Sequence, residues 1–141
     1  MANSKWPSAV FYTDKLPEGV GGDAHGPVVR IRPKYRSDEG IHRHELEHVQ
    51  QWWVVSLVSV VLLAVVFGMS MMVLSAIGVH SLLYMLVRPY RQWSEVRAYR
   101  IQMRYPNASG APLSLDSAAV RLAKPRYSLG LTVEQAKLLL S

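Results

Sequence analysis

The chain has 141 residues, a net charge of +6 and no cysteine, which bounds it to one domain or to a small domain with a membrane element. The lack of cysteine excludes a disulfide framework and a thiolate zinc site, so imidazole and carboxylate groups must hold any metal. All of the excess positive charge lies in residues 88–141, which follow an apolar block at 54–87. This arrangement favours anionic lipid headgroups over nucleic acid as a partner.

Two short stretches before the first predicted helix have the composition of β-strands. They are AVFYT (Ala9–Thr13) and PVVRIRP (Pro27–Pro33), and the second alternates apolar with basic residues. The Gly-rich segment Gly19–Gly26 between them is predicted to be a turn, so we expect a short N-terminal β-hairpin. The edge of Val28–Ile31 could accept an extended peptide substrate, but a purely structural hairpin with Ala9–Thr13 is the preferred interpretation.

The segment HRHELEHVQQWW contains two histidines four positions apart with a glutamate between them. A helix is predicted to begin near Glu39–Ile41, with Asp38 as its N-cap. Helical spacing places His44 and His48 on one face, where both imidazoles can reach one Zn²⁺. Glu45 would then be close enough to take a proton from water at the metal, as in metal-assisted hydrolysis. The alternative is a solvated, charged helix face that carries histidines by chance.

The 34 residues of the range 54–87 contain no Asp, Glu, Lys or Arg. As one helix they would reach about 50 Å, well beyond a hydrocarbon core of about 30 Å. The segment FGMSMM interrupts the block, and Gly68 is the best turn residue in it. We therefore predict an apolar helical hairpin over about residues 49–88, inserted in a lipid bilayer. The alternative is a hairpin buried in a soluble homo-oligomer.

The segment after the apolar block supplies the candidate third metal ligand. QWSEVRAYRIQMRY (Gln92–Tyr105) is predicted to be a helix, and Glu95 lies near its start. The other acidic residues beyond the block, Asp116 and Glu134, belong to short C-terminal helices and lack an aromatic setting. His80 is an alternative ligand, but its place inside the apolar hairpin favours a packed or hydrogen-bonded histidine.

Other side chains on this predicted helix have two possible roles each. Tyr99 shares a face with Glu95 and could donate a hydrogen bond to the oxyanion of a tetrahedral intermediate. Ordinary helix packing explains Tyr99 equally well. Arg97 and Arg100 could bind a substrate carboxylate, although contact with lipid headgroups or solvent is the preferred interpretation.

These motifs together resemble a known family. VVRIRPKYRSDEGIHRHELEHVQQ looks like the strand, turn and active-site helix of small gluzincin-type metallopeptidase-like proteins of bacteria and phages. YRQWSEVRAYRIQ is similar to the segment that carries their glutamate ligand, and RYSLGLTVEQAKLLL to their closing turn and last helix. The resemblance spans residues 27–141 and implies zinc on His44, His48 and Glu95, with Glu45 as base. The apolar connection between the two metal motifs is longer than the return helix of that family.

The metal site and the apolar block constrain each other. A single membrane span over residues 54–87 would place His48 and Glu95 on opposite faces of the bilayer, and one zinc could not bind both. A chain that turns back near Gly68 brings both ends to one side. Basic residues that flank the block on both sides favour a cytoplasmic location for both termini.

The sequence therefore predicts a mainly α fold in a single metallopeptidase-like domain, residues 1–141. A short β-hairpin, the HExxH helix, the apolar hairpin, the Glu-bearing helix and two short C-terminal helices (114–125 and 132–140) follow one another. The leading functional prediction is a membrane-associated zinc-dependent peptidase or peptidase-like hydrolase that acts on a peptide or protein substrate. The alternative is a non-catalytic membrane-inserting or oligomeric structural protein, such as a phage virion or ejection component lining a membrane conduit.

Overall fold

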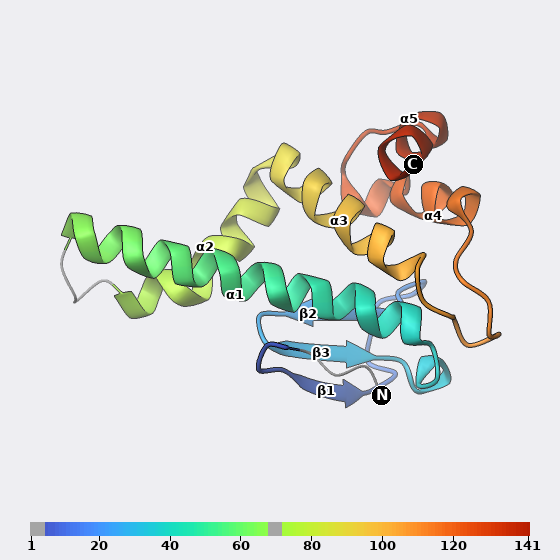
Figure 1. Cartoon of the computed structure of the whole chain (residues 1–141), viewed down its shortest axis with the longest axis horizontal. Coiled ribbons are helices and arrows are strands. Elements are labelled where there is room, and N and C mark those ends of the chain that lie inside the picture. Colours follow the sequence, from blue (N-terminus) through green and yellow to red (C-terminus); the bar gives the residue numbers. More distant parts are fainter. Residues whose placement is uncertain (1–4, 68–71) are drawn as a thin grey trace.

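The computed structural model of the chain describes residues 5–67 and 72–141 (Figure 1). The helix α1 (Glu39–Phe67) runs through the molecule, with a small sheet on one side and the C-terminal helices on the other. The mainly α fold with a short N-terminal sheet that the sequence predicts is confirmed.

The N-terminal sheet has the strand order β1-β3-β2. The strands are β1 (Ala9–Tyr12), β2 (Gly22–His25) and β3 (Val28–Ile31). The predicted hairpin between the first and last of these is wrong, because β1 pairs with β3 in parallel and β2 takes the antiparallel position. The segment predicted to be a turn is long enough to form β2, and Gly26 (φ 60°) supplies the left-handed residue of the tight turn into β3. Both edges of β3 are therefore occupied, and β2 is an edge strand.

The helix α1 is continuous from the metal motif into the apolar block. The predicted N-cap is confirmed, because Asp38 Oδ1 accepts a hydrogen bond from the Ile41 backbone N–H at 2.8 Å. No glycine or proline occurs between Ile41 and Phe67, so nothing in the backbone divides the HExxH segment from the first arm of the hairpin. Among the described residues, α1 is the one helix long and apolar enough to cross a membrane.

The second arm of the apolar block is α2 (Met72–Leu86), which packs back against α1 (Figure 1). The predicted turn at Gly68 lies outside the described residues. The return of the chain is nevertheless evident, because the Tyr84 ring near the end of α2 contacts His48 near the start of α1, with 6.3 Å between ring centroids. Several large apolar side chains on the two arms are exposed, namely Val61, Val65, Leu82, Met85 and Leu86.

The helix α3 (Arg88–Gln102) crosses α1 and carries Glu95. It begins four residues earlier than the predicted start at Gln92. Val87 has an extended backbone conformation, which ends α2 and changes the direction of the chain. Pro89 lies in the first turn of α3, where a backbone N–H would have no helical partner. This early start places Glu95 in the second turn of the helix, at the level of the two histidines of α1.

The C-terminal segment forms α4 (Leu115–Leu122) and α5 (Val133–Leu140). The predicted capping box of Thr132 and Gln135 is present at the start of α5. A hydrophobic cluster joins these helices to α3 through Tyr99, Leu122, Leu129 and Leu140, among others. A second cluster, Val29, Ile31, Ile41, Leu46 and Val49, joins the sheet to α1. The two cores hold the metal-motif half of α1 between them.

Candidate metal centre

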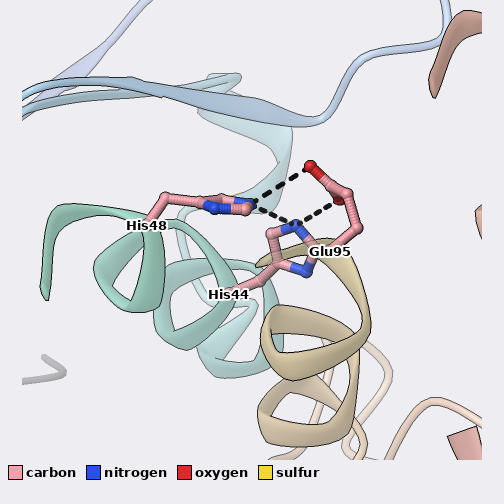
Figure 2. A group of neighbouring side chains, drawn as sticks. All are labelled: His44, His48 and Glu95. Atoms are coloured by element: carbon pink, nitrogen blue, oxygen red, sulfur yellow. Dashed lines mark hydrogen bonds and ion pairs between the residues drawn. The ribbon is translucent and has the colours of Figure 1, made fainter. Parts of the chain in front are cut away.

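Three side chains from two helices converge beside the sheet. His44 and His48 come from α1 and Glu95 comes from α3, and Figure 2 shows them pointing toward one another. The two Nε2 atoms of the histidines are 3.3 Å apart. Glu95 Oε2 lies 3.8 Å from His44 Nε2, and Glu95 Oε1 lies 3.5 Å from His48 Nε2. The structure thus brings together all three predicted ligands in a buried group that could hold a metal ion.

The geometry of this group fits a small cation. Tetrahedral coordination at about 2.0–2.1 Å places neighbouring ligand atoms about 3.3–3.4 Å apart, and the three measured separations are 3.3, 3.5 and 3.8 Å. Among the described residues, the buried Glu95 Oε2 atom has no hydrogen-bond partner. A buried carboxylate oxygen without a donor is costly, and a cation between the three residues would satisfy it.

A polar network behind His48 orients its imidazole. His48 Nδ1 lies 3.3 Å from Gln51 Oε1 and 3.2 Å from Ser94 Oγ. The Ser94 hydroxyl donates to the same Gln51 oxygen, and Gln51 Nε2 donates to Glu47 Oε1 at 3.3 Å. Because Gln51 Oε1 only accepts hydrogen bonds, His48 Nδ1 carries the proton. The lone pair of His48 Nε2 is therefore directed at the candidate metal position.

Residues of α2 support the third ligand. The Tyr84 hydroxyl donates a hydrogen bond to Glu95 Oε1, so one oxygen of the carboxylate is bound by protein and the other faces His44. His80 Nδ1 lies 2.7 Å from the Tyr90 hydroxyl, which is the hydrogen-bonded role that the sequence favoured over metal ligation.

Burial sets the protonation of the groups around the centre, which lies before the apolar half of α1. Burial lowers the pKa of His44 well below 6.5, helped by the charges of His48 and Arg126, so this imidazole is neutral as a ligand must be. Burial also raises the pKa of Glu45 well above 4.5, and the nearby Glu95 carboxylate adds to this effect. Glu45 is thus a carboxyl group with an increased proton affinity, which suits a proton carrier.

Tyr99 packs beside the metal group, which is one of the two roles that the sequence left open. Its ring packs edge-on against His44, with 4.6 Å between ring centroids, and only 2% of the residue is exposed. Its hydroxyl lies 2.8 Å from the Tyr127 hydroxyl, which in turn accepts a hydrogen bond from Arg126 at 2.9 Å. Burial raises the pKa of Tyr99, so its hydroxyl stays protonated. The oxyanion role of Tyr99 stays a prediction, and Tyr127 joins it as a candidate donor.

Two cavities meet at the centre, with volumes of about 400 and 680 Å³. Both cavities are lined by Gly22, His44, Glu45, Arg126 and Tyr127. The larger, apolar cavity extends toward α2 and includes Trp52, Tyr84 and Met85. The smaller, polar cavity extends toward α4 and includes Asn107, Arg121 and Lys124. Glu45 therefore lies where the two cavities meet.

The edge strand β2 runs along these cavities. The backbone N–H of Arg32, which follows β3, donates to the carbonyl oxygen of Gly21 at 2.9 Å. Gly21 and Arg32 are therefore a hydrogen-bonded pair of the ladder. In an antiparallel ladder such pairs alternate, and the backbone N–H and C=O groups of Gly22 and Ala24 therefore point to the free edge. The expectation that Val28–Ile31 could offer this edge is wrong, because that strand is the central one.

Several residues of the site lack a clear signal in the sequence. Tyr84, Arg126 and Tyr127 belong to segments far from the metal motif, and no spacing rule connects them to it. The edge strand could have been suspected only from the length of Gly19–Gly26, which exceeds a tight turn. Gln51 is the exception, because helical spacing places it beside His48.

Arg97 and Arg100 of α3 both make contacts within the chain. Arg97 forms an ion pair with the buried Glu47 and packs over Trp93. Arg100 donates to the carbonyl oxygen of Leu139 at the end of α5. Both side chains are also exposed to solvent, which agrees with the interpretation preferred from the sequence, whereas contact with lipid headgroups stays a prediction. Neither arginine lines the cavities at the candidate metal centre.

The chain matches no protein-family model, no curated protein and no solved structure. The resemblance to gluzincin-type proteins thus stays a prediction from the two metal motifs.

The raised pKa of Glu45 has a consequence for stability. A carboxyl group whose pKa is higher in the folded chain contributes stability below its unfolded value near 4.5, and this contribution is lost as pH rises. We expect metal-free Glu45→Gln to unfold at a higher temperature than metal-free wild type at neutral pH, with the difference vanishing near about pH 4. Thermal unfolding with a chelator, across this pH range, measures it.

Glu39→Gln serves as the control, because Glu39 is partly exposed and pairs with Arg43 on the surface of α1. This substitution should not produce the same pH-dependent gain. A wild type that becomes more stable than Glu45→Gln as pH rises would contradict the burial argument.

Proposed function

We propose that the chain is a membrane-associated zinc-dependent peptidase or peptidase-like hydrolase. The observation that carries the proposal is the convergence of His44, His48 and Glu95 beside the buried Glu45. Two imidazoles and one carboxylate form the donor set of catalytic zinc sites that leave one position for water. The resemblance to gluzincin-type proteins, drawn from the same residues, supports the same reaction class.

The residues of the centre supply the steps of such a hydrolysis. When bound, zinc would polarise the scissile carbonyl and increase the acidity of water. Glu45 accepts a proton from that water and returns it to the leaving amine. The hydroxyl pair of Tyr99 and Tyr127, backed by Arg126, supplies a hydrogen bond to the developing oxyanion. The network of Gln51 and Ser94 keeps His48 in the orientation that ligation needs.

The edge strand β2 supports a peptide as the substrate. An extended peptide can add to the outward-facing N–H and C=O groups of Gly22 and Ala24. In that position its side chains would enter the two cavities, and one of its peptide bonds would lie over Glu45. Backbone recognition of this kind needs no particular substrate sequence, so specificity would come from the cavities.

The apolar hairpin supports a membrane location for this hydrolase. Val65 and Leu86 are 81% and 76% exposed, and water-exposed apolar surface of this extent is unfavourable without lipid or a partner chain. Trp53 and Trp93 lie where the hairpin meets the rest of the chain, as interfacial aromatics do. We propose that the arms lie in lipid, that the metal centre lies at the cytoplasmic surface and that both termini are cytoplasmic.

The same exposed arms favour a second candidate function. A non-catalytic protein could use the hairpin to insert in a membrane or to assemble an oligomer, for example as a phage virion or ejection component. In that case the metal group would be structural or empty. Metal content and catalysis therefore decide between the two candidates.

The peptidase proposal predicts about one zinc per chain for protein purified in detergent. His48→Ala should lose the zinc, because it removes one of three ligands. Glu45→Gln should retain the zinc and lose peptide hydrolysis by about a hundredfold or more, because it removes the proton carrier. Elemental analysis and cleavage of a fluorogenic peptide library measure both quantities.

His80→Ala is the matched control for these variants, because His80 lies next to the centre and is hydrogen-bonded to Tyr90. It should retain zinc. Wild-type protein without zinc would exclude the enzyme, and wild-type protein with zinc but no cleavage would favour the non-catalytic candidate.

Gly22→Val should impair hydrolysis without loss of the metal. A Cβ atom at Gly22 would lie 3.1 Å from Glu45 Oε1 and 3.2 Å from the Arg30 carbonyl oxygen, so the Cβ alone requires the Glu45 side chain to give way by a few tenths of an ångström. The two methyl groups of valine require a larger shift, and a displacement of about 1 Å would lower turnover by about a hundredfold. Gly78→Ala, at a position with open space around it, is the control. Unchanged turnover in Gly22→Val would mean that Glu45 does not act from the observed position.

The hairpin topology can be tested by labelling, because the chain has no native cysteine. Ser37→Cys and Ala111→Cys lie on exposed segments before and after the hairpin. Both should react with a membrane-impermeant maleimide from the cytoplasmic face, whereas Val65→Cys in the first arm should react only after detergent is added. Labelling of Ser37→Cys and Ala111→Cys from opposite faces would contradict the hairpin.

A further inference from the structure

Positive charge gathers at the polar cavity beside the candidate metal centre. Three cationic side chains line it, Arg121 from α4, Lys124 just after α4 and Arg126 in the following turn. Both Arg121 and Lys124 are exposed, and their hydrogen bonds are made by backbone atoms. Among the described residues, no hydrogen bond or ion pair joins either side chain to another group. By contrast, Arg30 and Arg97 form ion pairs with acidic residues. Two cations thus face the cavity without a counter-ion.

The carboxylates around the polar cavity do not neutralise these cations. Asp38 lines it, but its Oδ1 atom is bound to the Ile41 backbone N–H at the start of α1. Glu45 also lines it and belongs to the proposed reaction centre. The larger cavity has the opposite balance of charged residues, although most of its surface is apolar. Three carboxylates line it (Asp23, Glu45 and Glu95), and Arg126 is the one Lys or Arg among its lining residues.

The direction of β2 decides which end of a peptide meets the cations. The strand runs from Gly22, which lines both cavities, to His25, which lines only the larger one. A peptide that adds antiparallel to β2 runs the other way, and antiparallel pairing is the more stable arrangement. Its N-terminal part then lies over the apolar cavity, and its C-terminal part reaches the polar cavity.

We propose that the polar cavity is a subsite for a substrate carboxylate on the C-terminal side of the bond over Glu45. The carboxylate is either the free C-terminus of a peptide or an acidic side chain near it, and Arg121 and Lys124 bind it with Arg126. The inference deepens the proposed function, since it takes a peptide as the ligand. A guanidinium and an ammonium group in a concave site recognise a carboxylate through charge-assisted hydrogen bonds.

A binding experiment tests the subsite apart from catalysis. The probes are three fluorescein-labelled hexapeptides with an apolar N-terminal half and an alanine-rich C-terminal half. One ends in a free carboxylate, one ends in an amide, and one ends in an amide but carries a glutamate in its C-terminal half. Fluorescence anisotropy measures their affinity for Glu45→Gln protein in detergent, in which cleavage is blocked.

We expect the two acidic probes, or one of them, to bind about tenfold more tightly than the neutral amide. The probe that binds identifies the source of the carboxylate. In the Glu45→Gln background, Arg121→Gln and Lys124→Gln together should remove the preference for acidic probes. Arg104→Gln in the same background should leave the preference unchanged, because Arg104 is exposed and lies outside both cavities. Higher salt should weaken the preference, because it screens exposed charges.

Equal binding of the three probes, or a preference that survives the double substitution, would overturn the subsite. The second result would show that the carboxylate binds elsewhere, for example at the metal position. The outcome does not depend on turnover, so a chain that binds zinc and cleaves nothing can still show the carboxylate preference. Conversely, a chain that cleaves peptides with no such preference would retain the proposed function and lose the subsite.

Discussion

The contact between α1 and α3 through His44, His48 and Glu95 is the constraint on which the rest of the structure depends. It places a carboxylate, two imidazoles and a second buried carboxyl group, Glu45, in one desolvated space. Such a group is stable only if its charges are paired or metal-bound. The hydrogen bonds from Tyr84 to Glu95 and from His48 to the Gln51 network satisfy part of this demand. Glu95 Oε2 has no hydrogen-bond partner among the described residues, and a cation bound between the three side chains would satisfy it.

The helix α1 links this polar centre to an apolar hairpin without a break. Its first half packs between the sheet and α3, whereas its second half exposes large apolar side chains such as Val61 and Val65. Because the helix is rigid, the orientation of the hairpin and that of the metal-motif histidines are coupled. A hairpin held in lipid would therefore keep the centre at a defined distance from the membrane surface.

The small sheet contributes more to the site than its size suggests. Its central strand β3 is fully paired, and this leaves β2 to border the cavities with an open edge. The two cavities that meet at Glu45 differ in character, one apolar beside α2 and one cationic beside α4. The two ends of an extended ligand along β2 would thus meet chemically different surroundings. This difference would favour one chain direction of the ligand over the other.

The sequence by itself determined the elements whose signals are local. Helical spacing identified His44, His48 and Glu45 on one helix, Asp38 and the Thr132 capping box were recognisable as caps, and the absence of charge over residues 54–87 marked the hairpin. Glu95 was also found, because few acidic residues follow the apolar block. Only the tertiary structure decided the strand order, the free edge of β2 and the places of Tyr84, Arg126 and Tyr127. These depend on long-range packing, which brings together segments with no shared periodicity, and such contacts leave no local pattern in a single sequence.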